Sequence, residues 1–307
     1  MQLGIWTDYY MELSPVDALK RLAGLGWKDV ELSAGHTLKL VKDPDWPDLT
    51  NSVIYRQKTG GLKLAKNSGW QERLEPVMQV IEEEGIKVWQ IHSPLDQDVA
   101  DFDPARRETA IELISRSLDV AHALSAPYTV IHPGGNIFAE DGSFRRGYRS
   151  KRERDRILEL NVSAFRQFCE KAEKWGLCVC AENGVAQGFC DWIYELWELI
   201  EAVGSKALGI CFDFSHANCL GLDIPEAIRE CGDRLWATHM SDNDGTADQH
   251  RMPFCGNIDW INVIAALKEV GYRNLFDLEI GGERCNPIEV QDAKLRFVKE
   301  VLEPMLK

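Results

Sequence analysis

Histidine and acidic side chains end six consecutive apolar segments of the sequence. They are His92, His132, Glu182, Asp213, His239 and Glu279, and His216 follows Asp213 by three residues. Imidazole and carboxylate groups together are typical ligands of Mn²⁺, Zn²⁺, Co²⁺ or Mg²⁺, and no cysteine stands among these positions. Because these residues lie far apart in the sequence, only a fold that gathers the segment ends could bring them to one ion.

The apolar segments have the length and composition of buried strands, and longer amphipathic segments separate them. The expected strands are 2–6, 29–33, 87–92, 128–132, 177–182, 207–213, 235–240 and 275–280, and the clearest expected helices are 14–26, 103–124, 154–176, 259–271 and 287–306. Near-continuous apolar strands are typical of a parallel sheet that is covered on both faces. Eight strand–helix repeats favour a closed barrel over an open sheet. We therefore predict an α/β fold in which residues 1–307 form a single (β/α)8 TIM barrel.

A closed parallel barrel brings the carboxyl ends of all its strands to one face. The six strand-end residues should therefore surround one axis, within side-chain reach of one point. Two long connections, about 34–69 and 133–150, follow strands and are expected to rise over this face as lids.

The segment "HMSDNDGTADQH", residues 239–250, contains two histidines and three aspartates. His239 ends the seventh expected strand, whereas Asp242, Asp244 and Gly245 are expected to form a solvated turn. Asp248 and His250 follow on the same loop. They could contact a second metal ion, or only the substrate and Arg251.

Composition limits the classes of partner. The chain has 35 Lys and Arg against 49 Asp and Glu, a formal net charge of −14, which repels nucleic-acid phosphates at long range. No apolar run approaches the ~20 residues that span a bilayer. The first residues, "MQLGIWTDYY", lack signal-peptide features, and the nine cysteines are scattered. We expect a cytoplasmic protein with reduced thiols and neither a nucleic-acid nor a membrane partner.

The strand-end residues resemble those of the xylose isomerase-like TIM barrels, and the resemblance runs through the whole chain. This superfamily includes sugar isomerases, ketose 3-epimerases, inosose dehydratases and type IV AP endonucleases. Its sugar enzymes bind one divalent ion through Glu, Asp, His and Glu at the ends of strands five to eight. The matching positions here are Glu182, Asp213, His239 and Glu279. One departure is "PFCG", residues 253–256, where the usual motif is "PGxG".

The resemblance implies a metal-dependent isomerase or epimerase that acts on a ketose or keto-sugar through an enediolate. Glu182 and Glu279 would be both metal ligands and the catalytic acid and base. The single ion would be Mn²⁺ by preference, with Zn²⁺, Co²⁺ or Mg²⁺ as alternatives. The residues expected to bind substrate are His92, His132, His216, Asp248, His250, Arg251 and Trp6. The resembled sugar enzymes are often dimers or tetramers, and a partner subunit is an alternative.

Two other activities stay open on the sequence. A lyase or dehydratase acting on a keto-sugar or inosose, including cleavage of a C-glycosidic bond, would need the same metal and base. The type IV AP endonucleases hold three zinc ions through additional residues that match His92, His132, His216, Asp248 and His250. That activity requires loops rich in Arg and Lys. The only basic cluster is "RRGYRSKRER", residues 145–154, so phosphodiester hydrolysis is the weaker alternative.

Overall fold

Eight parallel strands close into a barrel in the computed structural model, which describes residues 1–43, 69–95, 97–135, 147–185, 188–282 and 286–307. The strands are β1 Gln2–Trp6, β2 Asp29–Leu32, β3 Lys87–His92, β4 Tyr128–Ile131, β5 Cys178–Glu182, β6 Leu208–Asp213, β7 Leu235–Met240 and β8 Leu275–Leu278. They pair in sequence order, and β8 pairs with β1 to close the barrel. This confirms the predicted (β/α)8 architecture.

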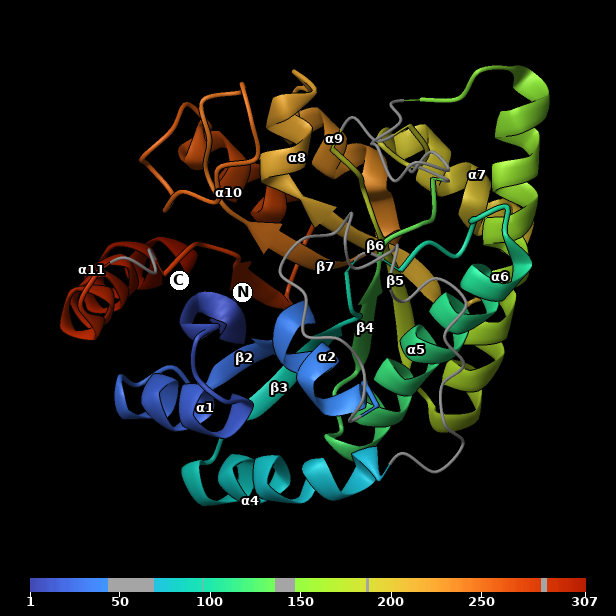
Figure 1. Ribbon diagram of the computed structural model, residues 1–307. Helices are drawn as coiled ribbons and strands as arrows, with labels where there is room; N and C mark the ends of the chain where they lie inside the picture. The colour runs from blue at the N-terminus through green and yellow to red at the C-terminus, as the bar shows by residue number, and fades with distance from the viewer. Residues whose placement is uncertain (44–68, 96, 136–146, 186–187, 283–285) are drawn as a thin grey trace.

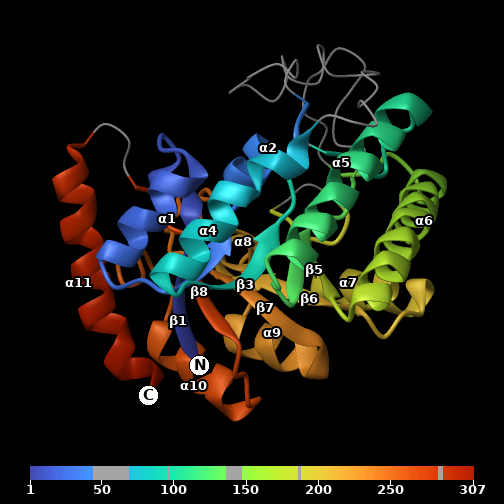
Figure 2. The same cartoon turned by 90° about the horizontal axis from the view of Figure 1, so that it is seen from below.

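Helices surround the strands (Figure 1). They are α1 Pro15–Gly24, α2 Ala34–Val41, α4 Glu75–Glu84, α5 Pro104–Ala123, α6 Lys151–Trp175, α7 Ile193–Val203, α8 Phe214–Cys219, α9 Ile224–Cys231, α10 Trp260–Glu269 and α11 Ile288–Leu306, with single 3-10 turns at η1 Thr7–Tyr10, η2 Trp70–Arg73 and η3 Gly232–Arg234. Helices α6 and α11 lie on opposite sides of the barrel in both views (Figure 2). None of the helices within the described ranges has the length and hydropathy needed to cross a bilayer.

Local sequence signals account for the helix boundaries. The hydroxyl of Ser14 accepts a hydrogen bond from the Asp17 amide, and Pro15 occupies the first position of α1. Ser150 caps α6 in the same way, so this helix begins three residues before the expected 154. Gly176 ends α6 with a φ of 68°, a left-handed conformation that glycine adopts without strain.

One of the two expected lids is partly wrong. Residues 34–41 form helix α2 directly after β2, and the helix packs against α5 and β3 rather than forming a loop. Its apolar side chains Leu40 and Val41 are buried, which explains why this segment is helical. Residues 44–68 and 136–146 of the expected lids lie outside the described residues.

The barrel interior changes from apolar to charged along its axis. Val130, Cys180, Cys211 and Ala237 form a small apolar cluster of buried residues from four adjacent strands. Side chains of a strand alternate between its faces, so the next inward positions on β5, β6 and β7 are Glu182, Asp213 and His239. Because side chains alternate along each strand, the charged residues form one layer directly above the apolar layer.

Candidate metal centre

Four side chains at the ends of β5 to β8 face a common point inside the barrel. Glu182, Asp213, His239 and Glu279 each offer one ligand atom, and the four atoms lie within 4.8 Å of one another. An ion with bonds of about 2.0–2.2 Å holds its ligands within roughly 4.4 Å of one another, so the spacing of these four atoms is close to that of a metal site. Asp213 Oδ2 and Glu279 Oε2 are buried without a hydrogen-bond partner. Because buried carboxylate oxygens need compensation, this donor set fits a divalent cation.

Glu182 lies between two groups of histidines. Its Oε1 is 2.9 Å from His239 Nδ1, while its Oε2 is 2.9 Å from His132 Nε2 and 3.2 Å from His92 Nε2. His92, His132 and Glu182 also bring three ligand atoms within 4.8 Å of one another. The carboxylate of Glu182 is therefore placed where it could serve one ion with each oxygen.

Burial and neighbouring charges push the pKa values of the metal-free site apart. Burial disfavours the charged form of Glu182, but His132 and His239 outweigh it and hold the pKa of Glu182 well below its usual value. Burial likewise disfavours the His92 cation, yet Glu182 raises the pKa of His92 to about 9. Burial raises the pKa of Glu279 to about 8, against the opposing effect of His239 and His250. The metal-free site therefore retains protons near neutral pH.

Asp248 connects the two remaining histidines. Its Oδ2 is 2.9 Å from His250 Nε2 and 3.4 Å from His216 Nε2, and its Oδ1 accepts a hydrogen bond from Ser215 at 3.0 Å. Burial opposes ionisation of Asp248, but hydrogen bonds from both histidines keep its pKa below the usual value. His250 also contacts the backbone oxygen of Glu279 through Nδ1 at 2.8 Å. The histidine–aspartate cluster is thereby joined to the four-residue group.

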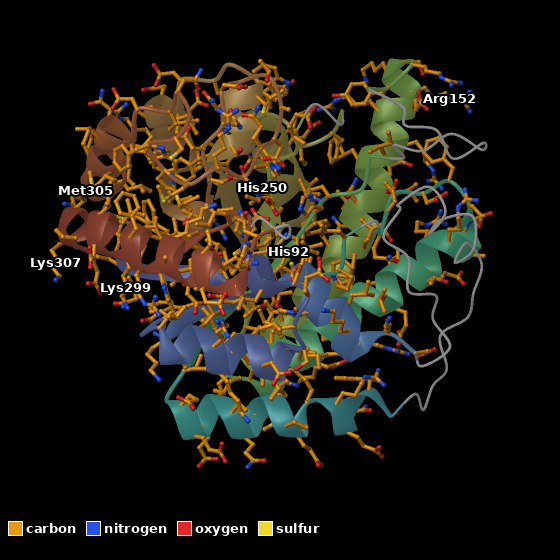
Figure 3. All side chains as sticks on the ribbon, turned by 60° about the vertical axis from the view of Figure 1, so that its left-hand side comes forward. His92, Arg152, His250, Lys299, Met305 and Lys307 are labelled. Carbon is orange, nitrogen blue, oxygen red and sulfur yellow. The ribbon has the colours of Figure 1, made fainter. Side chains whose placement is uncertain are left out.

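These residues open onto a cavity of about 220 Å³, whose lining includes His132, Glu182, His216, Asp248, His250 and Glu279. The described lining residues of this cavity include no arginine or lysine. His92 and His250 lie near the centre of the molecule, whereas Arg152 is at the outer end of α6 (Figure 3). The Trp6 indole stacks on His250 with 5.6 Å between ring centroids and 8° between their planes.

Residues 20–301 match the sequence pattern of the xylose isomerase-like TIM barrels. The chain belongs to this family. A Methanocaldococcus jannaschii protein without an assigned function is 31% identical over 194 residues, which cover 62% of this chain and 63% of that protein. An inosose isomerase of Bacillus velezensis is 23% identical over 41% of this chain and 48% of its own length. A probable endonuclease 4 of Thermoplasma acidophilum is 24% identical over 57% of this chain and 60% of its own. The chain thus spans less than two-thirds of each of these curated relatives.

Solved structures share the fold along the whole chain. A D-tagatose 3-epimerase-like protein superposes with a TM-score of 0.74 at 21% identity, covering 100% of this chain and 97% of that one. A D-psicose 3-epimerase, solved in the presence of D-fructose, gives a TM-score of 0.72 at 15% identity, with coverage of 100% and 99%. At such identities the likeness establishes the common architecture of these xylose isomerase-like barrels.

One expectation about the 239–250 segment needs correction. Asp242 is fully buried rather than solvated. Its oxygens accept hydrogen bonds from the amides of Asn243 and Ile258 and from the Trp260 indole, which compensate for the lost water. Arg251, which was expected to bind substrate, does not line the small cavity. Its guanidinium contacts Asp244 at 3.1 Å, and its side chain is 40% exposed. Asp244 is exposed, as expected of the turn, and Gly245 is half-buried.

Three buried residues of this xylose isomerase-like barrel were missed from the sequence. Glu31 on β2 accepts hydrogen bonds on Oε2 from His239 Nε2 at 2.9 Å and from Gln90 at 2.7 Å. Asp277 on β8 is fully buried, and burial together with Glu31 raises its pKa well above the usual value. Asn183 clamps β6 by exchanging two hydrogen bonds with the backbone of Asp213. An acidic residue inside an apolar strand was the available signal for Glu31 and Asp277.

Proposed function

We propose that the protein is a divalent-metal-dependent epimerase or isomerase of a ketose or keto-sugar. The observation that carries this proposal is the buried group of Glu182, Asp213, His239 and Glu279, two of whose carboxylates also line the small cavity. A bound ion, Mn²⁺ by preference, would supply Lewis acidity toward the carbonyl and neighbouring hydroxyl of the sugar. Such a cation would also replace the protons that the metal-free site retains.

The chain's own residues would move the proton. Glu182 and Glu279 enter the site from strands that are not neighbours in the barrel, so a sugar between them would present opposite faces to the two carboxylates. One carboxylate removes the proton beside the carbonyl, and the other returns a proton to the opposite face. His132 and His216 line the same cavity and are placed to donate hydrogen bonds to hydroxyl groups. His92 lies behind them against Glu182, so it would orient that carboxylate rather than contact the sugar.

The small cavity favours an uncharged sugar. An anionic phosphate group is normally bound by arginine, lysine or a helix N-terminus, and the described lining residues contain neither cationic side chain. The names of similar proteins support the same class of substrate, since they include a D-psicose 3-epimerase and an inosose isomerase. Elimination from a keto-sugar would use the same carboxylates and is the nearest alternative reaction.

Phosphodiester hydrolysis by a polymetal site is the second candidate. It is favoured by two further groups of ligand type, His92 with His132 and Glu182, and His216 with Asp248 and His250. Against it stand the net charge of −14 and the position of Arg152 at the outer end of α6 (Figure 3). The two candidates require different numbers of ions.

Metal content and a ketose screen test the proposal together. The purified protein is dialysed, its bound metal is counted by mass spectrometry, and ketoses are then supplied with added Mn²⁺. About one ion per chain and formation of an epimer or aldose are the expected results. Three tightly held zinc ions, with cleavage of duplex DNA at an abasic site, would instead establish the endonuclease activity.

A further inference from the structure

A second, larger cavity adjoins the metal centre. Its volume is about 970 Å³, at the upper end of the ~300–1,000 Å³ of small-molecule sites. Leu95 and His250 line both cavities, so the two spaces meet at these side chains. Leu95 is 50% exposed, so its side chain is accessible where the two cavities meet. A ligand bound at the metal centre could therefore extend past Leu95 and His250 into the larger cavity.

The walls of the larger cavity are mainly apolar and aromatic. They come from β1 with the turn η1 that follows it, from the loop after Arg251, and from the start of α11; the side chains that matter here are Trp6, Tyr9, Tyr10, Leu13, Met252 and Ile288. The Trp6 ring, which stacks on His250, stands at the boundary with the metal centre. An aromatic face at this position would contact a substituent on the side of a bound sugar that points toward the larger cavity.

Most polar side chains that line this cavity already have partners within the protein, and the unpaired Asp8 Oδ1 is buried away from solvent. The Trp6 indole donates to the Ile280 oxygen at 2.7 Å, and the Tyr9 hydroxyl donates to the Gln291 oxygen at 2.8 Å. Lys294 donates to the Gly281 oxygen at 3.0 Å, and the Arg251 guanidinium contacts Asp244 at 3.1 Å. A second sugar unit needs unsatisfied donors and acceptors, and an anionic group needs a cation that is not already paired. An aromatic group needs only the apolar faces that these contacts leave.

We propose that the larger cavity binds an aromatic substituent attached to the sugar, so that the substrate class is an aryl-substituted keto-sugar, such as an aryl glycoside whose sugar ring carries a ketone. This inference rests on the proposed function for the placement of the sugar at the metal centre. It adds that specificity comes from the second cavity, in which the substituent contacts Trp6 and Met252. The free hexose would then be the smaller and weaker ligand of the same site.

Calorimetry with two matched probes tests this inference without any turnover. Phenyl β-D-glucopyranoside and methyl β-D-glucopyranoside are titrated into the Mn²⁺-loaded protein, and phenol alone serves as a third ligand. We expect the phenyl glycoside to bind at least tenfold more tightly than the methyl glycoside, and more tightly than phenol. Equal affinities, or no detectable binding of either glycoside, would overturn the inference.

Two substitutions test whether the larger cavity causes the preference for the phenyl glycoside over the methyl glycoside. Met252→Asp should reduce it to less than threefold, because a carboxylate replaces an apolar wall. Leu95→Asp, at an exposed rim position, should act in the same direction and guards against a folding defect in the first variant. Ile261→Asp is the matched control, since Ile261 is 62% exposed on α10 and lines neither cavity. A preference that survives both Met252→Asp and Leu95→Asp would overturn the inference.

Failure of this inference and failure of the proposed function have different signatures. If the protein prefers the phenyl glycoside but converts no ketose or keto-sugar, the aromatic subsite is supported and the proposed epimerase activity is refuted. If the protein epimerises a free ketose but binds both glycosides equally, the proposed epimerase activity is supported and the aromatic subsite is refuted.

Discussion

Replacement of Glu31 by glutamine should weaken metal binding even though Glu31 is not one of the four proposed ligands. Its carboxylate Oε2 lies 2.9 Å from His239 Nε2, which leaves His239 Nδ1 facing Glu182 and Glu279 at 2.9 and 3.2 Å. An accepting carboxylate holds the proton on Nε2 and so keeps Nδ1 free as a metal ligand. Glutamine retains the volume but can present an amide N–H to His239, which favours the wrong tautomer.

The size of the effect follows from the position of Glu31. The side chain is fully buried, so water cannot replace the lost acceptor. Loss of such an outer partner costs about 10- to 100-fold in metal affinity, which corresponds to about 1.4–2.7 kcal/mol. Competition between the protein and a chelator for Mn²⁺ measures this change directly, and calorimetry provides a second value.

Glu195→Gln is the matched control for Glu31→Gln. Glu195 is also a fully buried glutamate, but it contacts Tyr148 and Arg154 rather than any proposed ligand. Glu195→Gln should lower the melting temperature and leave the affinity for Mn²⁺ unchanged. An unchanged affinity in Glu31→Gln, or an equal loss in both variants, would refute the role given to Glu31.

Four further predictions concern pH, metal binding, folding and catalysis. His92 has a pKa of about 9 and Glu279 of about 8 in the metal-free fold, above their ordinary values of 6.5 and 4.5. The folded state therefore holds more protons than the unfolded chain, so the unfolding free energy of the metal-free protein should fall as the pH rises from about 5 to 9. Mn²⁺ binding at pH 7 should likewise release protons, measured by calorimetry in buffers of different ionisation enthalpy, and zero release would contradict these pKa shifts. Asp242→Ala should lower the unfolding free energy by roughly 3–5 kcal/mol in urea, because it leaves the buried donors of Ile258 and Trp260 unpaired. Asp244→Ala, at an exposed position, is the control. A loss of stability in Asp242→Ala no greater than that in Asp244→Ala would contradict the role given to Asp242. Glu182→Gln and Glu279→Gln should each lower epimerisation by about 10²- to 10⁴-fold, and full activity of either variant would remove it from the proton-transfer step.

The sequence was sufficient to predict the barrel and the position of the strand-end residues. Apolar strands alternating with amphipathic helices have few solutions, and a closed parallel barrel places every strand end on one face. Glu182, Asp213, His239 and Glu279 meet for that reason alone. No knowledge of side-chain contacts was needed for this part of the prediction.

Contacts between distant segments could not be predicted in the same way. Asp242 lies in an acidic run of the kind that is usually solvated, yet its partners Ile258 and Trp260 come 16 and 18 residues later in the chain. The acidic residue in β2 was a visible signal, but the partners of Glu31 on β3 and β7 could not be predicted from the sequence. The larger cavity likewise forms between the two ends of the chain, which no local pattern encodes.

Proton exchange in D₂O tests the central claim most directly. A ketohexose is incubated with the Mn²⁺-loaded protein, and deuterium at the carbon beside the carbonyl is followed by NMR together with the appearance of the epimer. We expect deuterium incorporation that disappears when the metal is chelated and is lost in Glu182→Gln or Glu279→Gln. Absence of exchange with every ketose and keto-sugar, in a protein that retains its metal, would contradict it.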